Sequence, residues 1–375
     1  MSRVKSEIPF VGLHAHSVAG SVFDALGFPQ DHMDFAYDNG NDALALTDHG
    51  NMNGLAYQVL HAKKMKSQGR DFKPIYGCEA YFVPSVSEWR EEYEKAKEDK
   101  KRARALAKSK AGLSVEDEGA TKSGNSNIIN RRRHLVLVVQ NQTGLSNLFK
   151  LISESYTEEN FYRFPRIDYK LLKKYNEGII AASACLGGVY AGCLWENREQ
   201  GNKFIIQMSK EFGFKLISTA DSHYPNPDAW KDRELYKRLG WLGRGMPKWA
   251  EGNTELPAGV EEIGYELYPK NGDQMFASYK TYSEDGDYDD QLVLDSIKET
   301  HNIAFNRIET FAPDNTIRLP DFVVPAGFSA DDALAKLSLD GLKEMMGWTT
   351  KTKVGPEQKE YIERLHHELN VIAER

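Results

Sequence analysis

The first two-thirds of the chain alternate short apolar runs with amphipathic stretches, and this alternation restricts the fold more than any other feature of the sequence. The apolar runs predict strands at residues 9–16, 41–50, 72–84, 131–141, 177–188 and 214–224. The amphipathic stretches predict helices at residues 29–40, 52–69, 143–156 and 203–213. Strands that alternate with helices indicate a mostly parallel sheet, either open or closed into a barrel. In both architectures the functional site lies at the carboxyl ends of the strands.

Two segments depart from this alternation. Residues 85–130 begin with a charged run that places opposite charges four residues apart, which is typical of a solvated helical arm. A contact with nucleic acid or a partner chain is the alternative, through Lys100, Lys101, Arg102, Arg104, Lys108 and Lys110. Periodicity weakens again near residues 247–289, and three helical patterns follow. We therefore expect two domains, residues 1–255 and residues 256–375.

Composition limits the class of protein. The 375 residues carry a net charge of −7, which argues against DNA binding over the whole surface but not against a local basic patch. The three cysteines and the N-terminus, which lacks a signal-peptide pattern, favour a cytoplasmic protein without disulfides. Because no apolar run reaches about 18 residues, we expect no membrane span.

Side chains that bind metals stand at the end of nearly every predicted strand. His14 and His16 lie one residue apart, so they share one face of the first strand. Asp221 and His223 form a second such pair in the last strand. Further residues of this kind at strand ends or in adjoining loops are Asp24, Asp48, His49, Glu79, His134 and Cys185. Imidazole, carboxylate and thiolate groups bind transition metals, so their joint placement predicts a site for several ions.

Each residue also has an ordinary structural explanation. Asp48 is suited to cap the helix that follows it, and Asp24 is suited to a turn. Free cysteines such as Cys185 usually belong to the core, which is also our interpretation of Cys78 and Cys193. The remaining histidines are interpreted as surface or packing residues: His32, His61, His301, His366 and His367. Only the joint occurrence of many ligand types at strand ends favours the metal site.

Seven motifs follow one another along the chain: LHAHSVAGSVFDA, LALTDHGNMNG, KPIYGCEAYFVP, RRHLVLVVQNQTGLSNLFKLIS, FYRFPRID, EGIIAASACLGG and TADSHYPNPDAW. In this order they resemble the PHP (polymerase and histidinol phosphatase) domain, in the form that begins bacterial and phage replicative polymerases of the DNA polymerase III alpha type. The later segments YELYPKNGDQMF and RLPDFVVPAGFSADDALAKLSLDGLKEMMG resemble the same family. The last segment, YIERLHHELNVIAER, is similar to the part that leads into the palm domain.

The resemblance implies an α/β fold, a distorted (β/α)7 barrel followed by a helical extension similar to the start of the palm. The metal ligands that it implies are His14, His16, Asp24, His49, Glu79, His134, Cys185, Asp221 and His223. His14, His16, Asp221 and His223 are expected to be catalytic. Two or three divalent ions are expected, and the imidazole and thiolate ligands favour Zn²⁺ or Mn²⁺.

Two further residues have expected roles around this set. Asp48 is expected to orient His49, because ligating histidines usually donate to a carboxylate or a carbonyl. Arg166 is expected to contact a phosphate, with a structural salt bridge to Asp168 or a neighbour as the alternative. The sequence departs from the family pattern in three places. The loop before Asp24 is one residue longer, the insertion before His134 is long, and the segment between Cys185 and Asp221 is short by a strand and part of a helix.

The implied activity is metal-dependent 3′–5′ exonuclease proofreading, with the 3′ end of a DNA primer or a single strand as substrate. The implied setting is the cytoplasm of a bacterial or phage-infected cell, with a polymerase catalytic part on the same or a separate chain. No palm carboxylates are present, so we expect no polymerisation by this chain alone. Two alternatives remain, a small-molecule phosphoesterase of the histidinol phosphatase type and a structural metal-binding scaffold of a split polymerase. The polymerase-like part after Tyr265 disfavours the first, and the complete ligand set disfavours the second.

Overall fold

The computed structural model describes residues 3–111, 132–185, 187–190, 198–242, 266–282, 289–314, 316, 322–349 and 351–374. The chain forms two compact units, Met1–Asp314 and Asn315–Arg375, and each is considered by itself. The expected boundary between residues 255 and 256 lies outside the described residues, as does Cys193. Residues 266–282 and 289–314 belong to the first unit.

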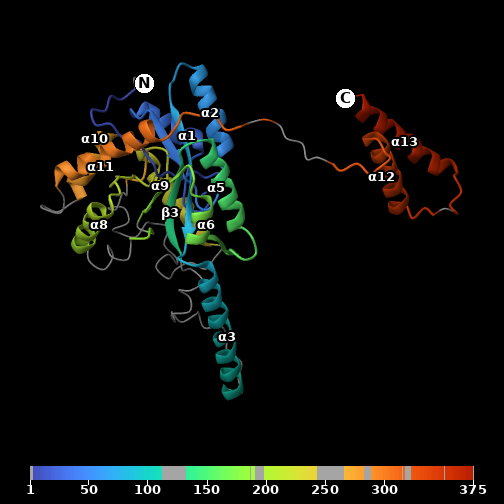
Figure 1. The fold of residues 1–375 in the computed structure, drawn as a ribbon, viewed down its shortest axis with the longest axis horizontal. Helices are drawn as coiled ribbons and strands as arrows, with labels where there is room; N and C mark the ends of the chain where they lie inside the picture. Colours follow the sequence, from blue (N-terminus) through green and yellow to red (C-terminus); the bar gives the residue numbers. More distant parts are fainter. Residues whose placement is uncertain are drawn as a thin grey trace. The chain divides into compact units, whose positions relative to one another are not determined.

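A six-stranded mixed sheet forms the centre of the first unit (Figure 1). Five strands are hydrogen-bonded to one another in the order β4 (Phe161–Tyr162), β5 (Phe164–Ile167), β2 (Lys73–Phe82), β3 (Arg133–Val139) and β6 (Ile179–Ala182). The sixth strand, β1 (Ala43–Leu46), also pairs with β2. Both β1 and β5 run parallel to β2. In contrast, β3 runs antiparallel to both β2 and β6. At the edge of the sheet, β4 is antiparallel to β5. The sheet predicted as mostly parallel is therefore mixed, with β3 reversed in its middle and β4 reversed at its edge.

The segments at residues 9–16 and 214–224 extend this sheet through single bridges rather than as regular strands. Gly12 pairs with Leu44 of β1, and Ala15 pairs with Ser222, both in parallel. The amide of His16 donates to the carbonyl of Ser222 at 2.7 Å. These bridges place the N-terminal segment between β1 and the segment that carries Ser222.

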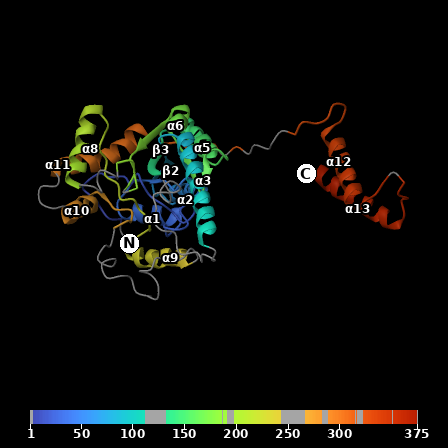
Figure 2. The ribbon, with the colours of Figure 1, turned by 90° about the horizontal axis from the view of Figure 1, so that it is seen from below.

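Helices cover the sheet on two sides. The helices α8 (Arg198–Phe212), α10 (Gly272–Tyr282) and α11 (Asp290–Asn302) lie on one side of the strands (Figures 1 and 2). On the other side lie α2 (Leu55–Ser67), α5 (Gln142–Ser155) and α6 (Tyr169–Tyr175). The remaining helices beside the sheet are α1 (Pro29–Asp38) and α9 (Trp230–Leu242). The α/β fold expected from the sequence is confirmed.

Alternation along β3 divides the core between the two faces of the sheet. Leu137 and Val139 pack with buried residues of β2 and with Leu145, Leu148 and Leu151 of α5. Val136 and Val138 pack on the opposite face, with β1 and with the π-helix Ile303–Arg307. This is the period of two that a strand buried on both faces requires. Cys78 of β2 is fully buried in the first of these clusters, as predicted.

The charged insertion begins as α3 (Val86–Ala111), and residues 112–131 lie outside the described part. Trp89 and Tyr93 of α3 stack with ring centroids 5.5 Å apart, and both are buried at the base of the helix. In the second unit the described residues form two helices, α12 (Ala330–Met345) and α13 (Pro356–Ala373). None of the helices in the described part has the length and apolar character that a bilayer crossing requires.

Candidate metal centre

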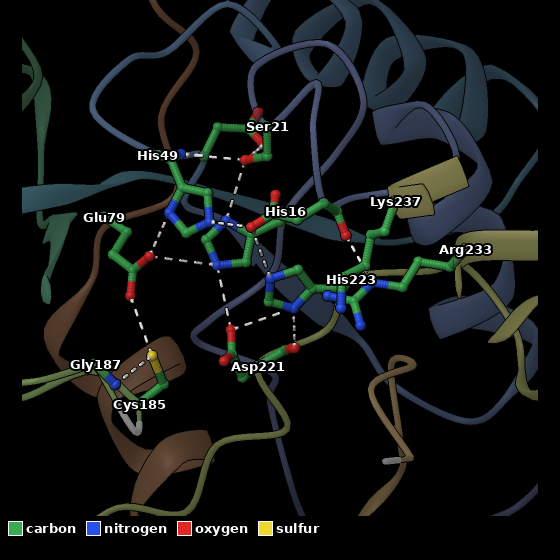
Figure 3. Close-up of polar contacts among 12 residues, drawn as sticks. His16, Ser21, His49, Glu79, Cys185, Gly187, Asp221, His223, Arg233 and Lys237 are labelled. Atoms are coloured by element: carbon green, nitrogen blue, oxygen red, sulfur yellow. Dashed lines mark hydrogen bonds and ion pairs between the residues drawn. The ribbon is translucent and has the colours of Figure 1, made fainter. Parts of the chain in front are cut away.

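The residues expected to bind metal come from distant parts of the chain and meet at one end of the sheet (Figure 3). His14 and His16 flank Ala15, which pairs with Ser222, so Asp221 and His223 lie on the adjacent segment. His49 follows β1 and forms a parallel bridge with Glu79 of β2. The sheet thus brings these residues to the carboxyl ends of its parallel elements.

His134 joins them from the opposite end of its own strand. It is the second residue of β3 and pairs with Tyr81, near the end of β2. Because β3 is antiparallel, the start of this strand lies at the same edge of the sheet as the end of β2. Cys185, which follows β6, lies there as well, with its Sγ 3.6 Å from Nδ1 of His134.

The first group of ligand types consists of His14, His16 and Asp221. The two Nε2 atoms lie 3.0 Å apart, and Oδ1 of Asp221 lies 3.3 Å from Nε2 of His14 and 3.2 Å from Nε2 of His16. Ligands that bind one ion at about 2.0–2.2 Å are about 2.8 to 3.6 Å apart in octahedral or tetrahedral geometry. These three donor atoms therefore have the spacing of ligands on a common ion.

A second group is centred on Glu79, whose side chain is fully buried. Oε2 of Glu79 lies 2.6 Å from Nδ1 of His49, and Oε1 lies 3.1 Å from Nδ1 of His134. Oε1 also lies 3.6 Å from Sγ of Cys185. The two oxygens of one carboxylate thus connect two histidines and a thiol.

The third group consists of His16, His49 and His223, with Asp24 beside it. Oδ2 of Asp24 lies 3.1 Å from Nε2 of His49 and 3.9 Å from Nε2 of His223. Asp24 therefore reaches the other residues in spite of the longer loop that precedes it. All nine residues that the resemblance implied as ligands form one connected set of side chains.

Several buried polar atoms in this set have no hydrogen-bond partner among the described residues. They include Nδ1 of His49, Oε2 of Glu79 and Oδ1 of Asp221. The first two lie 2.6 Å apart without the geometry of a hydrogen bond. Buried polar groups are nearly always satisfied, so unpaired lone pairs that face one another fit bound cations. The donor set, imidazole and carboxylate with one thiol, fits divalent transition metals.

The acidic and basic groups of the site shift one another's pKa. Burial raises the pKa of Glu79, but the charge of His14 and the close contacts with His134, His14 and His49 outweigh it and hold the pKa well below its usual range. Burial lowers the pKa of His14, and the charges of Asp221 and Glu79 reverse this and raise it. Burial, with His49 and His223, lowers the pKa of His16 to about 3. The carboxylates are therefore ionised at neutral pH, as metal ligands must be.

Two ligand types of this cluster, Asp221 and Cys185, have unusual local properties. Asp221 has a left-handed backbone with φ of 46°, which costs a non-glycine residue about 1 kcal/mol and is typical of functional sites. Burial and the charges of Asp221 and Glu79 raise the pKa of Cys185, so its thiol is neutral without a cation. A bound metal ion reverses that shift, because it binds the thiolate.

Asp48 and Arg166 do not lie where the sequence analysis expected. The described hydrogen bonds of the Asp48 carboxylate come from Ser17 and Ser21 and not from the ring of His49. Arg166 is completely buried, its guanidinium lies 3.7 Å from the ring centre of Trp89, and it donates to the carbonyl of Tyr162 at 2.8 Å. A phosphate contact requires an accessible guanidinium, so Arg166 packs the base of α3 instead.

Arg233 lies at the site but was missed by the sequence analysis. From α9 its Nε donates to the carbonyl of Asp24 at 2.7 Å, and the hydroxyl of Tyr236 donates to the carbonyl of Val22. The helix thus holds the loop that carries Asp24 at two points. No local pattern marks these residues, because the loop precedes the helix by about 200 residues.

Metal binding is expected to release protons and to weaken as the pH falls. The pKa of His49 is raised well above its usual range, since the hydrogen bond with Asp24, the close contact with Glu79 and the charges of both outweigh burial, and that of His14 is raised as well. Below these raised pKa values both imidazoles hold protons that a metal must displace. The affinity for Zn²⁺ should fall about tenfold per pH unit for each proton displaced, as the pH falls below the raised pKa values of these imidazoles.

Calorimetry in two buffers of different ionisation enthalpy measures the protons released. The matched control is His61→Gln, since His61 pairs with Asp34 on the surface, away from the metal groups. This variant should release the same number of protons as the wild type. An affinity that does not change with pH, with no proton release, contradicts the prediction.

Comparisons with known proteins relate this chain to a protein family that the sequence motifs resemble. A family model for the PHP domain matches residues 12–217. The DNA polymerase III subunit alpha of Aquifex aeolicus is 29% identical over 399 residues, which cover 97% of this chain and 30% of that protein. That of Borreliella burgdorferi is 27% identical over 396 residues, covering 97% of this chain and 28% of that protein. The chain therefore spans less than a third of the length of these curated relatives.

Among solved structures, an amidohydrolase from Chromobacterium violaceum aligns over 60% of this chain and 96% of its own, at 15% identity and a TM-score of 0.27. A likeness this low supports no argument about the fold. The family match, in contrast, covers more than half of the chain and includes the residues from His14 to Cys185. The chain belongs to the PHP domain family.

Proposed function

We propose that this chain is a metal-dependent 3′–5′ exonuclease that removes nucleotides from the end of a DNA primer or single strand. The observation that supports it is the connected set of nine ligand types at one end of the sheet, with lone pairs that face one another. Similarity over 97% of the chain to DNA polymerase III alpha subunits favours DNA over a small phosphate ester. The same similarity supports a polymerase part as partner and a bacterial or phage-infected cell as the setting.

Three sets of residues would hold the metal ions, with Zn²⁺ or Mn²⁺ as the best fit. One set is His14, His16 and Asp221, the second is His49, Glu79, His134 and Cys185, and the third is Asp24 with His16, His49 and His223. Ions held this way supply Lewis acidity and a water of lowered pKa for phosphodiester hydrolysis.

The exposure of these side chains supports one direction of approach for a substrate. His14, His16 and Glu79 are completely buried, whereas the side chains of Asp24, Asp221 and His134 are 35%, 21% and 20% exposed. The buried residues exclude bulk water from one side of the site. The exposed ones form the edge at which a phosphodiester can approach.

The test is shortening of 3′-labelled DNA, single-stranded or ending in a mispair, with Zn²⁺ or Mn²⁺ present. The wild type should shorten both substrates. The rate of shortening should be lower by at least about a hundredfold in Asp221→Asn, because residues that only support a ligand typically contribute ten- to hundredfold. Asp228→Asn, in the turn before α9, is the matched control and should keep full activity. No metal-dependent shortening contradicts the proposal. Turnover of a small phosphate monoester alone supports the phosphoesterase alternative, and metal binding without turnover of either supports the scaffold.

Phe23 is expected to help hold the DNA substrate. Phe23 directly precedes Asp24, and its side chain is 59% exposed. Exposed aromatic rings near a nucleic-acid site commonly stack on bases. Phe23→Ala should raise KM for single-stranded DNA by about five- to a hundredfold, which is about 1–3 kcal/mol of lost stacking, with little change in kcat. Steady-state kinetics on a short oligonucleotide measure this, with Phe212→Ala, exposed at the end of α8, as the control. An unchanged KM excludes the stacking role.

A further inference from the structure

A buried network of hydroxyls and one carboxylate contacts the ring of His16 at Nδ1, the nitrogen that faces away from the metal groups. Nδ1 of His16 lies 3.2 Å from Oγ of Ser21, on the side of the ring opposite to the metal-facing Nε2. Oγ of Ser21 lies 2.9 Å from Oδ1 of Asp48 and accepts from the amide of His49 at 3.2 Å. Ser21, Asp48 and His16 are 3%, 1% and 0% exposed, so water does not compete for these bonds.

The number of protons available fixes the direction of each bond. An ionised carboxylate only accepts, and Asp48 already accepts from the amide of Ser17 at 2.6 Å and from its hydroxyl at 2.9 Å. The single hydroxyl proton of Ser21 therefore goes to Asp48. With that proton committed, Ser21 can only accept from His16, so the proton of the neutral ring sits on Nδ1.

We propose that Asp48 and Ser21 are positioning residues that hold His16 in the tautomer whose Nε2 lone pair faces the metal. The inference rests on the metal-binding part of the proposed function, and it concerns the protein before any metal binds. Nε2 of His16 then faces Oδ1 of Asp221 at 3.2 Å and Oε2 of Glu79 at 3.7 Å, both acceptors. These three lone pairs repel one another unless a proton on Nε2 of His14, 3.0 Å from Nε2 of His16, or a bound cation lies between them.

The same network explains why the sequence analysis assigned Asp48 to the wrong histidine. Asp48 is adjacent to His49 in the chain, but its carboxylate turns to the loop that carries Ser17 and Ser21. Its effect on the metal centre therefore passes through a hydroxyl to a histidine 32 residues earlier. The hydroxyl also accepts from the amide of His49, so it connects the loop at Ser21 to the segment that follows β1.

The test uses the full chain without metal, labelled with ¹⁵N in its histidines. Long-range ¹H–¹⁵N spectra distinguish the two tautomers, and His16→Gln identifies the resonances of His16. We expect the proton on Nδ1 in the wild type, its loss from that position in Ser21→Ala, and its return in Ser21→Thr. Zn²⁺ affinity, measured by competition with a chromogenic chelator, should fall ten- to hundredfold in Ser21→Ala and recover in Ser21→Thr.

Ser155→Ala is the matched control, because Ser155 is a buried serine of α5 whose hydroxyl donates to the carbonyl of Ile152. It should change neither measurement. A wild-type ring with its proton on Nε2 overturns the inference, as does an equal loss of affinity in Ser21→Ala and Ser155→Ala. If the tautomer and the affinity respond as expected but no DNA is shortened, the positioning role stands and the exonuclease proposal alone fails.

Discussion

Glu79→Gln is expected to remove bound metal and to lower nuclease activity by more than about a hundredfold. Residues that only support a ligand typically contribute ten- to hundredfold, and Glu79 lies within 4 Å of five of the other expected ligands, His16 at 3.7 Å among them. Its oxygens lie 3.1 Å from Nε2 of His14, 2.6 Å from Nδ1 of His49 and 3.1 Å from Nδ1 of His134, with Cys185 at 3.6 Å. The amide of glutamine has the same shape but lacks the charge and has one acceptor instead of two.

Metal content by mass spectrometry and the rate of DNA shortening measure the effect of Glu79→Gln. Glu154→Gln is the matched control, because Glu154 pairs with Lys174 and Tyr175 at the surface of α5 and α6. It should keep its metal and its activity. A thermal melt shows that each variant is folded, and a folded Glu79→Gln protein with full metal content contradicts the assignment.

Removal of the metal ions is expected to lower the thermal midpoint by roughly 8 °C. A ligand present at a thousand times its Kd stabilises the folded state by about 4 kcal/mol, and a domain of this size shifts by about 2 °C per kcal/mol. The physical reason is the cluster of carboxylates with depressed pKa, Asp24, Glu79 and Asp221. Without cations, protons on His14 and His49 balance part of this charge.

Calorimetric melts with and without excess chelator at neutral pH test this expectation, and added Zn²⁺ should restore the midpoint. The Glu79→Gln variant serves as the internal control. Because it is expected to hold little metal, its thermal midpoint should change little when chelator is added. At lower pH the response to chelator should shrink, because protonation of His14 and His49 displaces the metal in any case. Identical midpoints with and without chelator at neutral pH contradict a structural contribution of the metal.

The sequence predicted the elements better than their directions. Period-two and helical patterns located β1, β2, β3 and β6 and the helices between them, because these segments bury whole faces. Nothing in the pattern shows that β3 is reversed, since periodicity is the same in both directions. The segments around Ala15 and Ser222 were predicted as strands, but their pairing is limited to single bridges.

For the candidate metal centre, too, part could be predicted from the sequence and part could not. Residue types and strand ends, together with the family resemblance, named His14, His16, Glu79 and the others that the structure brings together. Contacts that depend on long-range folding could not be predicted. The stacking of Arg166 on Trp89 requires the inserted helix, and the bond from Arg233 to the Asp24 carbonyl requires α9 to return over an early loop.

The reversal of β3 has a consequence for the insertion that precedes it. Phe82 at the end of β2 pairs directly with Arg133 at the start of β3, so the chain leaves and re-enters the sheet at neighbouring positions. A short turn is enough to join two antiparallel neighbours, whereas a parallel pair needs a long crossover. The segment between them, beyond the buried base of α3, is thus not needed for this pairing, so its length can change while Glu79 and His134 stay in register.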